Sequence, residues 1–274
     1  AEKRRLGEPL VMVTAYDHPS ALAADRAGVD LVLVGDSGAM TVLGYDSTVP
    51  VTLDELLVLA RAVRRGLSTP FMVGDLPFGS YEVSDEQAVT TAMRFVKEAG
   101  CDAVKLEGGG ETSVARARAI VNAGIPVMGH VGLTPQTSTA LGGYKAQGRT
   151  AAAAARVREE ALALQQAGCF SIVFEAIPSA VSAAIMPEME ALIIGIGAGP
   201  STDGQVLVFH DLLGIRDGRG ARFVQRYADL LEEMVAGVGA FAADVRSRHY
   251  PAPHHDYTIP AEELAAFKAG LPGH

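Results

Sequence analysis

The stretch Leu31-Val-Leu-Val-Gly-Asp36 is a short apolar run that ends in an acidic residue, and the same plan recurs along the chain. Four further runs end in a polar residue: Phe71-Met-Val-Gly-Asp75, Ala103-Val-Lys-Leu-Glu107, Pro126-Val-Met-Gly-His130 and Ser171-Ile-Val-Phe-Glu175. Continuous runs of Val, Ile and Leu are typical of parallel strands that are buried on both faces. Because the carboxyl ends of parallel strands meet at one edge, acids there repel one another unless a cation or a proton lies among them. The pattern predicts a metal-assisted enzyme on an α/β scaffold.

Apolar strands alternate with alanine-rich helices along the 274 residues. The periodicity predicts strands near 10–16, 31–36, 70–75, 103–107, 126–131, 171–175, 192–197 and 205–210. Helices are expected near 19–27, 52–65, 84–99, 111–123, 150–167, 178–187 and 221–247. Eight strands that mostly alternate with helices indicate a (β/α)8 TIM barrel, although the link between the last two strands is too short for a full helix.

The dipeptide Ala-Gly precedes three of these strands and is expected to end a helix each time, with the glycine as the C-cap. These glycines are Gly28, Gly100 and Gly168, at intervals of about two βα units. Because no linker divides the chain, one barrel domain is expected over residues 1–250. Residues 251–274, with Pro-Ala-Pro-His-His and a short final helix, would form a C-terminal appendage of the same domain.

Composition limits the class of protein. The chain is 49% hydrophobic, which is ample for a large core, and its net charge of −9 argues against nucleic acid or an anionic membrane surface as a partner. No apolar run reaches the ~20 residues that a membrane span needs, and the first residues contain no apolar core of a signal peptide. A cytoplasmic location is therefore expected.

The two cysteines are too few for a disulfide framework. Cys101 and Cys169 each lie between an Ala-Gly pair and a strand, at the edge of the sheet opposite the acids. We expect both to be small buried core residues, so the sequence does not favour a thiolate metal site.

Asp36 and Asp75 both follow Val-Gly, and glycine lets a ligand approach the backbone closely. Two carboxylates, with water and a chelating substrate, make a typical Mg²⁺ site, because this ion keeps several waters and takes few protein ligands. The alternative is that each aspartate caps the following loop or helix. The matched contexts favour the metal role.

Four further residues at the same edge could carry chemistry. Lys105 and Glu107 share one face of a strand, and an inward-facing lysine is costly unless it is paired, which favours a functional pair. His130 is either a ligand or a satisfied core residue. Glu175 ends an otherwise apolar run, and apolar surroundings raise a carboxyl pKa, which suits proton transfer near neutral pH. The alternative for Glu175 is a structural pair with an arginine.

The segment Gly195-Ile-Gly-Ala-Gly199 follows a strand and is rich in glycine. It is either a phosphate-binding loop of the kind found late in barrels or a turn that passes close to a ligand.

Taken together, these motifs resemble the ketopantoate hydroxymethyltransferase family, also called 3-methyl-2-oxobutanoate hydroxymethyltransferases, over nearly the whole chain. The most specific stretches are Lys105-Leu-Glu-Gly-Gly109, Gly129-His-Val-Gly-Leu-Thr-Pro-Gln136, Gly142-Gly-Tyr-Lys-Ala-Gln-Gly-Arg149 and Asp203-Gly-Gln-Val-Leu-Val208. The family's Gly-Asp-Ser-Leu-Gly-Met motif reads Gly35-Asp-Ser-Gly-Ala-Met40 here, so Gly38 and Ala39 replace the Leu-Gly pair. This departure affects the shape of the loop rather than the aspartate.

The resemblance implies a barrel of the phosphoenolpyruvate/pyruvate superfamily and a one-carbon transfer. The co-substrate 5,10-methylenetetrahydrofolate would give a hydroxymethyl group to 3-methyl-2-oxobutanoate through a Mg²⁺-stabilised enolate. The product would be 2-dehydropantoate, for pantothenate and coenzyme A synthesis. The implied partners are thus a small 2-oxo acid and folate, and the implied assembly is a homo-oligomer, commonly a decamer.

The same resemblance implies roles for individual residues. Mg²⁺ would be held by Asp36 and Asp75, with Glu107 in its outer shell. The residues implied to hold the 2-oxo acid are Ser37, Asp75, Lys105 and His130. Glu175 would be the catalytic acid/base.

Two competing interpretations follow from the same pattern. One is a carbon–carbon lyase or mutase of the phosphoenolpyruvate/isocitrate lyase type, in which isocitrate lyases carry a catalytic cysteine on the edge where the acids lie. Cys101 and Cys169 fall on the other edge, which disfavours it. The other is a barrel that binds ligand or serves assembly without catalysis. The altered Gly38-Ala39 loop would fit this interpretation, whereas the full set of polar residues at the strand ends argues against it.

Overall fold

The computed structural model describes residues 2–140, 142–216, 218 and 220–272, and in this part of the chain eight parallel strands pair in chain order. They are β1 (Leu10–Thr14), β2 (Leu31–Val34), β3 (Phe71–Asp75), β4 (Ala103–Lys105), β5 (Val127–Gly132), β6 (Ser171–Glu175), β7 (Leu192–Ile196) and β8 (Gly204–Leu207). The ring closes where β8 pairs with β1. This confirms the (β/α)8 barrel that the sequence predicts.

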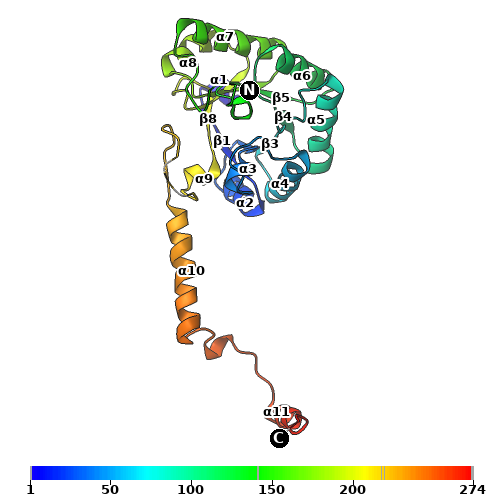
Figure 1. The fold of residues 1–274 in the computed structure, drawn as a ribbon, viewed down its shortest axis with the longest axis vertical. Helices are drawn as coiled ribbons and strands as arrows, with labels where there is room; N and C mark the ends of the chain where they lie inside the picture. Colours follow the sequence, from blue (N-terminus) through cyan, green and yellow to red (C-terminus); the bar gives the residue numbers. More distant parts are fainter. Residues whose placement is uncertain (1, 141, 217, 219, 273–274) are drawn as a thin grey trace. The chain divides into compact units, whose positions relative to one another are not determined.

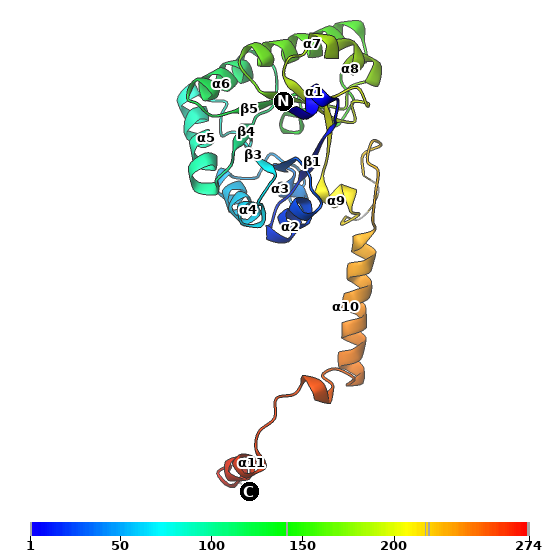
Figure 2. The ribbon, with the colours of Figure 1, turned by 180° about the vertical axis from the view of Figure 1, so that it is seen from behind.

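Helices surround the strands in both views of the molecule (Figures 1 and 2). They are α2 (His18–Arg26), α3 (Gly38–Thr41), α4 (Leu53–Gly66), α5 (Asp85–Ala99), α6 (Glu111–Asn122), α7 (Ala151–Gln166), α8 (Ser179–Ile185) and α9 (Phe209–Leu212), with 3-10 turns η1 (Pro135–Thr137) and η2 (Met186–Glu188). Side-chain caps begin α4, α5 and α7, as at Thr52, whose hydroxyl and Glu55 form a capping box. The three Ala-Gly glycines all adopt positive φ at helix ends, as predicted.

Two expected boundaries differ from the structure by three residues or more. The last strand ends at Leu207 rather than near 210, because the Phe209 amide donates to the Thr14 hydroxyl at 2.8 Å and starts the short helix α9. The last long helix begins at Leu230 rather than 221. Residues 221–229 are instead an irregular segment, in which the Tyr227 amide donates to the Leu212 carbonyl at 2.9 Å.

Alternation along each strand divides the core into two layers. On β6, Ile172 and Phe174 pack toward the helices, whereas Val173 packs inside the barrel. We call the inside layer the inner cluster; its buried members are Met12, Leu31, Leu33, Val73, Ala103, Met128, Val173, Ile194, Ile196 and Val206. These side chains fill the barrel, so a residue further along the same face reaches its carboxyl end.

The amino-terminal end of the barrel is covered by α1 (Glu2–Leu6). The Arg4 guanidinium donates to the Met189 carbonyl at 2.7 Å and forms an ion pair with Asp203 at 3.1 Å. These contacts hold the first residues of the chain against the segments that lead into β7 and β8. The cavity that holds the predicted site residues lies at the other end, where the strands finish.

Residues 229–274 form a second compact unit. It contains α10 (Leu230–Ser247), the 3-10 turn η3 (Pro253–His255) and α11 (Ala261–Ala269), which is the expected short final helix. The division into a domain over 1–250 and an appendage over 251–274 stays a prediction. None of the helices in the described residues is long and apolar enough to cross a membrane.

Cys101 and Cys169 are buried, as predicted, and burial raises the pKa of each thiol to about 12. Both precede strands, at the end of the barrel away from the acids. We therefore expect Cys101→Ser and Cys169→Ser to keep near-normal turnover and to lose stability, since a buried hydroxyl without a partner costs roughly 1–3 kcal/mol. Urea denaturation and steady-state rates check this. A folded variant without turnover would support the competing interpretation, a cysteine-dependent lyase.

Candidate active site

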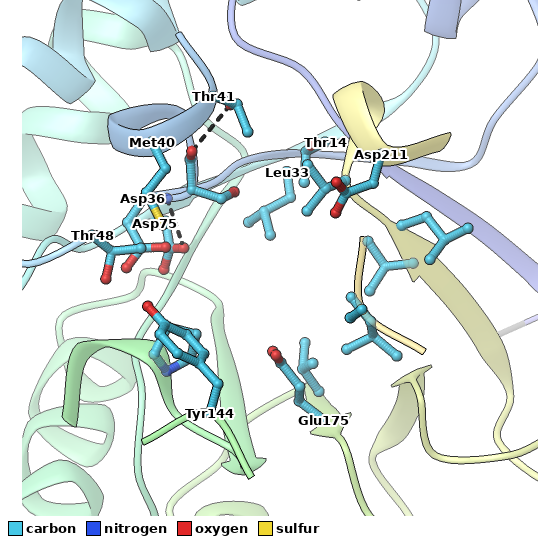
Figure 3. A pocket seen from close by; sticks show the side chains of 18 of the residues that line it. Thr14, Leu33, Asp36, Met40, Thr41, Thr48, Asp75, Tyr144, Glu175 and Asp211 are labelled. Atoms are coloured by element: carbon cyan, nitrogen blue, oxygen red, sulfur yellow. Dashed lines mark hydrogen bonds between the residues drawn. The ribbon is translucent and has the colours of Figure 1, made fainter. Parts of the chain in front are cut away.

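A cavity of about 640 Å³ lies at the carboxyl ends of the strands and contains most of the predicted site residues. Those that line it are Asp36, Ser37, Asp75, Lys105, His130 and Glu175. Figure 3 shows Asp36, Asp75 and Glu175 directing their side chains into this one space. Glu107 lies just behind the wall and contacts Lys105 and His130.

Strand register brings these side chains together. On four strands the functional residue lies two positions after a member of the inner cluster: Asp75 after Val73, Lys105 after Ala103, His130 after Met128, and Glu175 after Val173. Two positions along a strand return to the same face, so all four point inward. Asp36 reaches the cavity differently, because β2 ends at Val34 and a turn follows.

Lys105 is buried among carboxylates. Its ammonium lies 2.7 Å from Asp75 Oδ1 and 3.6 Å from Glu107 Oε1. Asp75 and Lys105 are paired across β3 and β4, so the register itself creates this ion pair. Burial alone would lower the pKa of Lys105, but Asp75 and Glu107 outweigh it and raise the pKa. Lys105 is therefore a fixed positive charge, and the expected Lys105–Glu107 pair is present.

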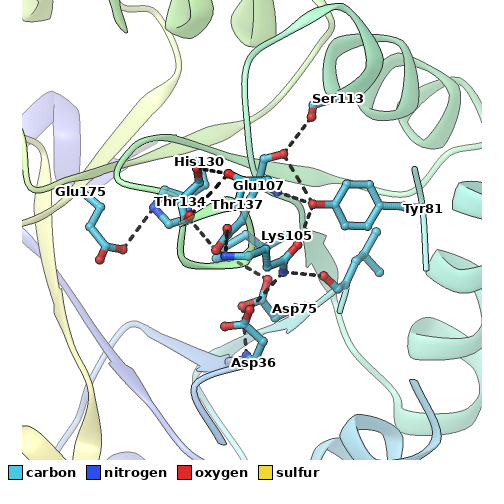
Figure 4. Close-up of polar contacts among 12 residues, drawn as sticks. Asp36, Asp75, Tyr81, Lys105, Glu107, Ser113, His130, Thr134, Thr137 and Glu175 are labelled. Carbon is cyan, nitrogen blue, oxygen red and sulfur yellow. Dashed lines mark hydrogen bonds and ion pairs between the residues drawn. The ribbon is translucent and has the colours of Figure 1, made fainter. Parts of the chain in front are cut away.

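His130 lies between two carboxylates (Figure 4). Its Nδ1 is 3.3 Å from Glu107 Oε1 and its Nε2 is 3.2 Å from Glu175 Oε2. These are ion-pair contacts rather than aligned hydrogen bonds, since neither ring nitrogen meets hydrogen-bond geometry with a described residue. Burial would lower the pKa of His130, but Glu107 and Glu175 raise it to about 9. At neutral pH the ring is an imidazolium, and the partner of Glu175 is this ring.

The raised pKa of His130 predicts how stability depends on pH. A folded-state pKa of about 9 against an ordinary 6.5 means that the stabilisation is complete below pH 6.5 and is lost as pH rises through 9. In the metal-free protein, wild type should therefore lose its stability advantage over His130→Asn across this window, by on the order of a few kcal/mol. Urea unfolding from pH 6 to pH 10 measures it. An advantage that does not change with pH would show that His130 is not an imidazolium.

Asp36 and Asp75 are crowded and buried. The Asp36 amide donates to Asp75 Oδ2 at 3.1 Å, so the two residues are adjacent. Burial, followed by the charges of Asp75 and Glu107, raises the pKa of Asp36 well above its usual range. Burial likewise raises the pKa of Asp75, although Lys105 opposes the rise. These two carboxyls hold their negative charge only with difficulty in the absence of a further cation.

The loop that departs from the family motif forms the short helix α3. Gly38 packs tightly here, since a Cβ at this position would lie 2.8 Å from Tyr16 Cδ1 and 3.0 Å from Leu59 Cδ1. The Tyr16 hydroxyl is 2.8 Å from Ser37 Oγ. The substitution therefore accommodates Tyr16, and Asp36 and Ser37 still line the cavity.

The glycine-rich segment after β7 is a close-packed turn. A Cβ at Gly197 would lie 2.5 Å from Phe223, and one at Gly199 would lie 2.3 Å from Ser179. Phe223 also lines the cavity, so the turn supports one of its walls.

Three residues around the cavity have no role in the sequence analysis. The Thr48 hydroxyl is buried in the wall, with no hydrogen-bond partner among the described residues. Gln136 donates to the Asp36 carboxylate, and the Tyr81 hydroxyl donates to Gln136 and accepts from the Glu107 amide. Gln136 lies in the loop that follows the strand carrying His130, a position that could have indicated it. Tyr81 comes from the loop after β3, and no sequence pattern points to it.

Comparison with known proteins gives the family. A model of the ketopantoate hydroxymethyltransferase family matches residues 1–253. The 3-methyl-2-oxobutanoate hydroxymethyltransferase 1, mitochondrial, of Arabidopsis thaliana is 50% identical, with 98% of this chain and 80% of the relative covered. The 3-methyl-2-oxobutanoate hydroxymethyltransferase of Geobacillus kaustophilus is 47% identical, with 98% of this chain and 96% of the relative covered.

Solved structures show the fold alone, because their identity to this chain is low. Phosphonopyruvate hydrolase in complex with oxalate and Mg²⁺ has a TM-score of 0.60 at 12% identity and covers 97% of this chain and 95% of its own. A 2,3-dimethylmalate lyase, a member of the PEP mutase/isocitrate lyase superfamily, has a TM-score of 0.58 at 15% identity and covers 98% and 96%. These two likenesses agree with the barrel fold that the strands form. With a family model over residues 1–253 and close relatives over nearly its full length, the chain belongs to the ketopantoate hydroxymethyltransferase family.

Proposed function

We propose that this chain transfers a hydroxymethyl group from 5,10-methylenetetrahydrofolate to 3-methyl-2-oxobutanoate, with Mg²⁺, and so forms 2-dehydropantoate for pantothenate synthesis. The family supports the transferred group and the acceptor, which its members' names state. The observation that carries the proposal is the cavity in which the buried pair Asp36 and Asp75 faces the same space as Lys105, His130 and Glu175.

The charges of the cluster fit a divalent cation. Four carboxylates (Asp36, Asp75, Glu107 and Glu175) lie with two cations (Lys105 and His130), which leaves two negative charges without a partner in the cluster. The raised pKa values of Asp36 and Asp75 express this imbalance, which a bound divalent ion would correct. Mg²⁺ suits a pair of carboxylates because it keeps several waters and takes few protein ligands.

Glu107 lies where it would contact residues around the metal rather than the metal itself. Its Oε1 faces Lys105 and His130, and its Oε2 accepts from the Gln136 amide at 3.0 Å. Lys105 and His130 together lower the pKa of Glu107 despite its burial, so it remains ionised. It would therefore orient the two cations of the site, which supports the outer role that the resemblance implies.

When bound, Mg²⁺ would polarise the 2-oxo group of the substrate as a Lewis acid. The residues of the chain would then have separate roles. Lys105 and His130 supply positive charge for the substrate carboxylate and for the negative charge that develops on loss of the C3 proton. Ser37 lines the same space and can donate a hydrogen bond to the bound acid.

Glu175 is the residue we assign to proton transfer. Its side chain is 15% exposed at the cavity, whereas those of Asp75, Lys105 and Glu107 are nearly inaccessible. It can therefore approach C3 of a substrate held by Lys105 and His130. The His130 ring at 3.2 Å fixes the orientation of its carboxylate.

A turnover assay tests the proposed function. Purified protein with Mg²⁺, 3-methyl-2-oxobutanoate and 5,10-methylenetetrahydrofolate should form 2-dehydropantoate, and omission of the folate or addition of a chelator should stop it. Product formation at an undiminished rate in chelator would contradict the metal role. The absence of product under saturating conditions, from a folded protein, would contradict the activity itself.

The assembly and location remain predictions. A homo-oligomer, with the decamer implied by the family, would cover apolar side chains that α10 exposes, among them Val235, Val238 and Phe241. The cytoplasmic location is expected from the sequence, although the plant relatives' names place those proteins in mitochondria. The lyase alternative is disfavoured because both cysteines are buried away from the cavity.

A further inference from the structure

Gln136 makes hydrogen bonds to two carboxylates of the acidic cluster, those of Asp36 and Glu107. It lies in η1, in the loop that follows β5, and is 4% exposed. Its side-chain Nε2 donates to Asp36 Oδ2 at 3.0 Å and to the Leu76 carbonyl at 3.0 Å. Its backbone amide donates to Glu107 Oε2 at 3.0 Å. One residue thus holds the carboxylates of both Asp36 and Glu107.

The orientation of the Gln136 amide is fixed by its surroundings. Both partners of Nε2 are acceptors only, so the NH₂ group has to face them. The other end, Oε1, accepts from the Tyr81 hydroxyl at 2.8 Å. That hydroxyl in turn accepts from the Glu107 amide at 3.3 Å. Tyr81 remains a neutral donor, because burial, with Glu107 next, raises the pKa of its phenol.

We propose that Tyr81 and Gln136 form a positioning relay that presents Asp36 to the metal. The inference rests on the proposed metal role of Asp36. With Oδ2 bound to the amide of Gln136, the Asp36 carboxylate cannot rotate freely, and Oδ1 is the oxygen that Gln136 does not hold. Two hydrogen bonds, from Tyr81 to Gln136 and from Gln136 to Asp36, therefore set the direction of one metal ligand.

Mg²⁺ binding measured by calorimetry, in the absence of substrates, tests the relay. Partners that orient metal ligands are worth roughly 10–100-fold in affinity. Gln136→Leu should lose affinity in this range, and Tyr81→Phe, which removes only the hydroxyl, should shift it in the same direction by less. The double variant should be no weaker than Gln136→Leu, because both act through one carboxylate.

Gln87→Leu is the matched control. Gln87 also uses both ends of its amide, since its Nε2 donates to the Gly79 carbonyl at 2.9 Å and its Oε1 accepts from the Val83 amide at 3.0 Å, but it lies in α5 and does not line the cavity. Gln87→Leu should leave Mg²⁺ affinity within about twofold of wild type, which is the margin of the measurement. Its loss of thermal stability should be that expected from breaking the loop contact alone.

The outcomes separate the relay from the proposed function. If Gln136→Leu and Tyr81→Phe both bind Mg²⁺ like wild type, the relay is wrong and the metal role of Asp36 stands. If Gln136→Leu does not fold, Tyr81→Phe alone decides, because a phenylalanine fills the same space. If wild type and Asp36→Asn bind Mg²⁺ equally weakly, the metal role itself is wrong and the relay falls with it.

Discussion

Replacing Asp75 with alanine is expected to abolish hydroxymethyl transfer while the barrel remains folded. In its proposed role Asp75 would provide one of the two carboxylates for the metal, and it also holds the Lys105 ammonium at 2.7 Å. Its loss would leave Lys105 with the longer contact to Glu107 as its ion pair among the described residues, and would remove half of the metal's proposed protein ligands. Asp36→Ala should have the same effect on turnover. Rates measured across a wide range of Mg²⁺ concentration, with circular dichroism as the test of folding, check this.

A surface aspartate provides the control for this pair. Asp54 is exposed and pairs with Arg94, so Asp54→Ala should leave the rate and its dependence on Mg²⁺ unchanged. The account is wrong if either Asp36→Ala or Asp75→Ala keeps a near-normal rate at low Mg²⁺. In the metal-free state, Asp36→Asn should be more stable than wild type at neutral pH. The reason is that a carboxyl with a raised pKa destabilises the fold once it ionises.

The second large effect is expected from Glu175→Gln. Glutamine keeps the shape of the side chain and can still accept a hydrogen bond from His130, but it cannot carry a proton. Binding of 3-methyl-2-oxobutanoate and Mg²⁺ should stay close to normal, and turnover should fall by roughly 10²–10⁴-fold. Calorimetry and steady-state rates measure the two quantities separately. Glu190→Gln, at an exposed position outside the cavity, is the matched control.

The behaviour of the C3 proton distinguishes the possible roles of Glu175. If Glu175 removes that proton, exchange at C3 should fall in parallel with turnover. Exchange that persists while transfer stops would place Glu175 on the folate half of the reaction and would require another residue as the base. Wild-type exchange and transfer in the variant would show that Glu175 is structural.

Most of the barrel and its polar edge could be predicted from the sequence, because both follow from periodicity. Two-residue alternation on buried strands places Lys105 and Glu175 on the inside as soon as the strands are recognised. Asp36 shows the limit of this argument. A strand that ran to residue 36 would turn Asp36 away from Leu33, and only the turn after Val34 brings it into the cavity.

Contacts between distant loops could not be predicted. Tyr81 and Gln136 come from different loops, and their hydrogen bond depends on how those loops pack rather than on any repeat. The partner of Glu175 could not be predicted either. The apolar run before Glu175 gives no sign of the His130 ring, which contacts it from the adjacent strand β5. The start of α10 was misplaced for the same reason, because tertiary contacts hold the preceding segment in an irregular conformation.

The measurement that tests the central claim most directly is exchange of the C3 proton of 3-methyl-2-oxobutanoate for deuterium, followed by NMR without folate. The account predicts that the wild-type protein exchanges this proton rapidly with Mg²⁺ present. Exchange should fall to the uncatalysed rate in chelator or in Asp75→Ala. Exchange that proceeds equally fast in chelator, or that stays at the uncatalysed rate with Mg²⁺ while the full reaction runs, would contradict it.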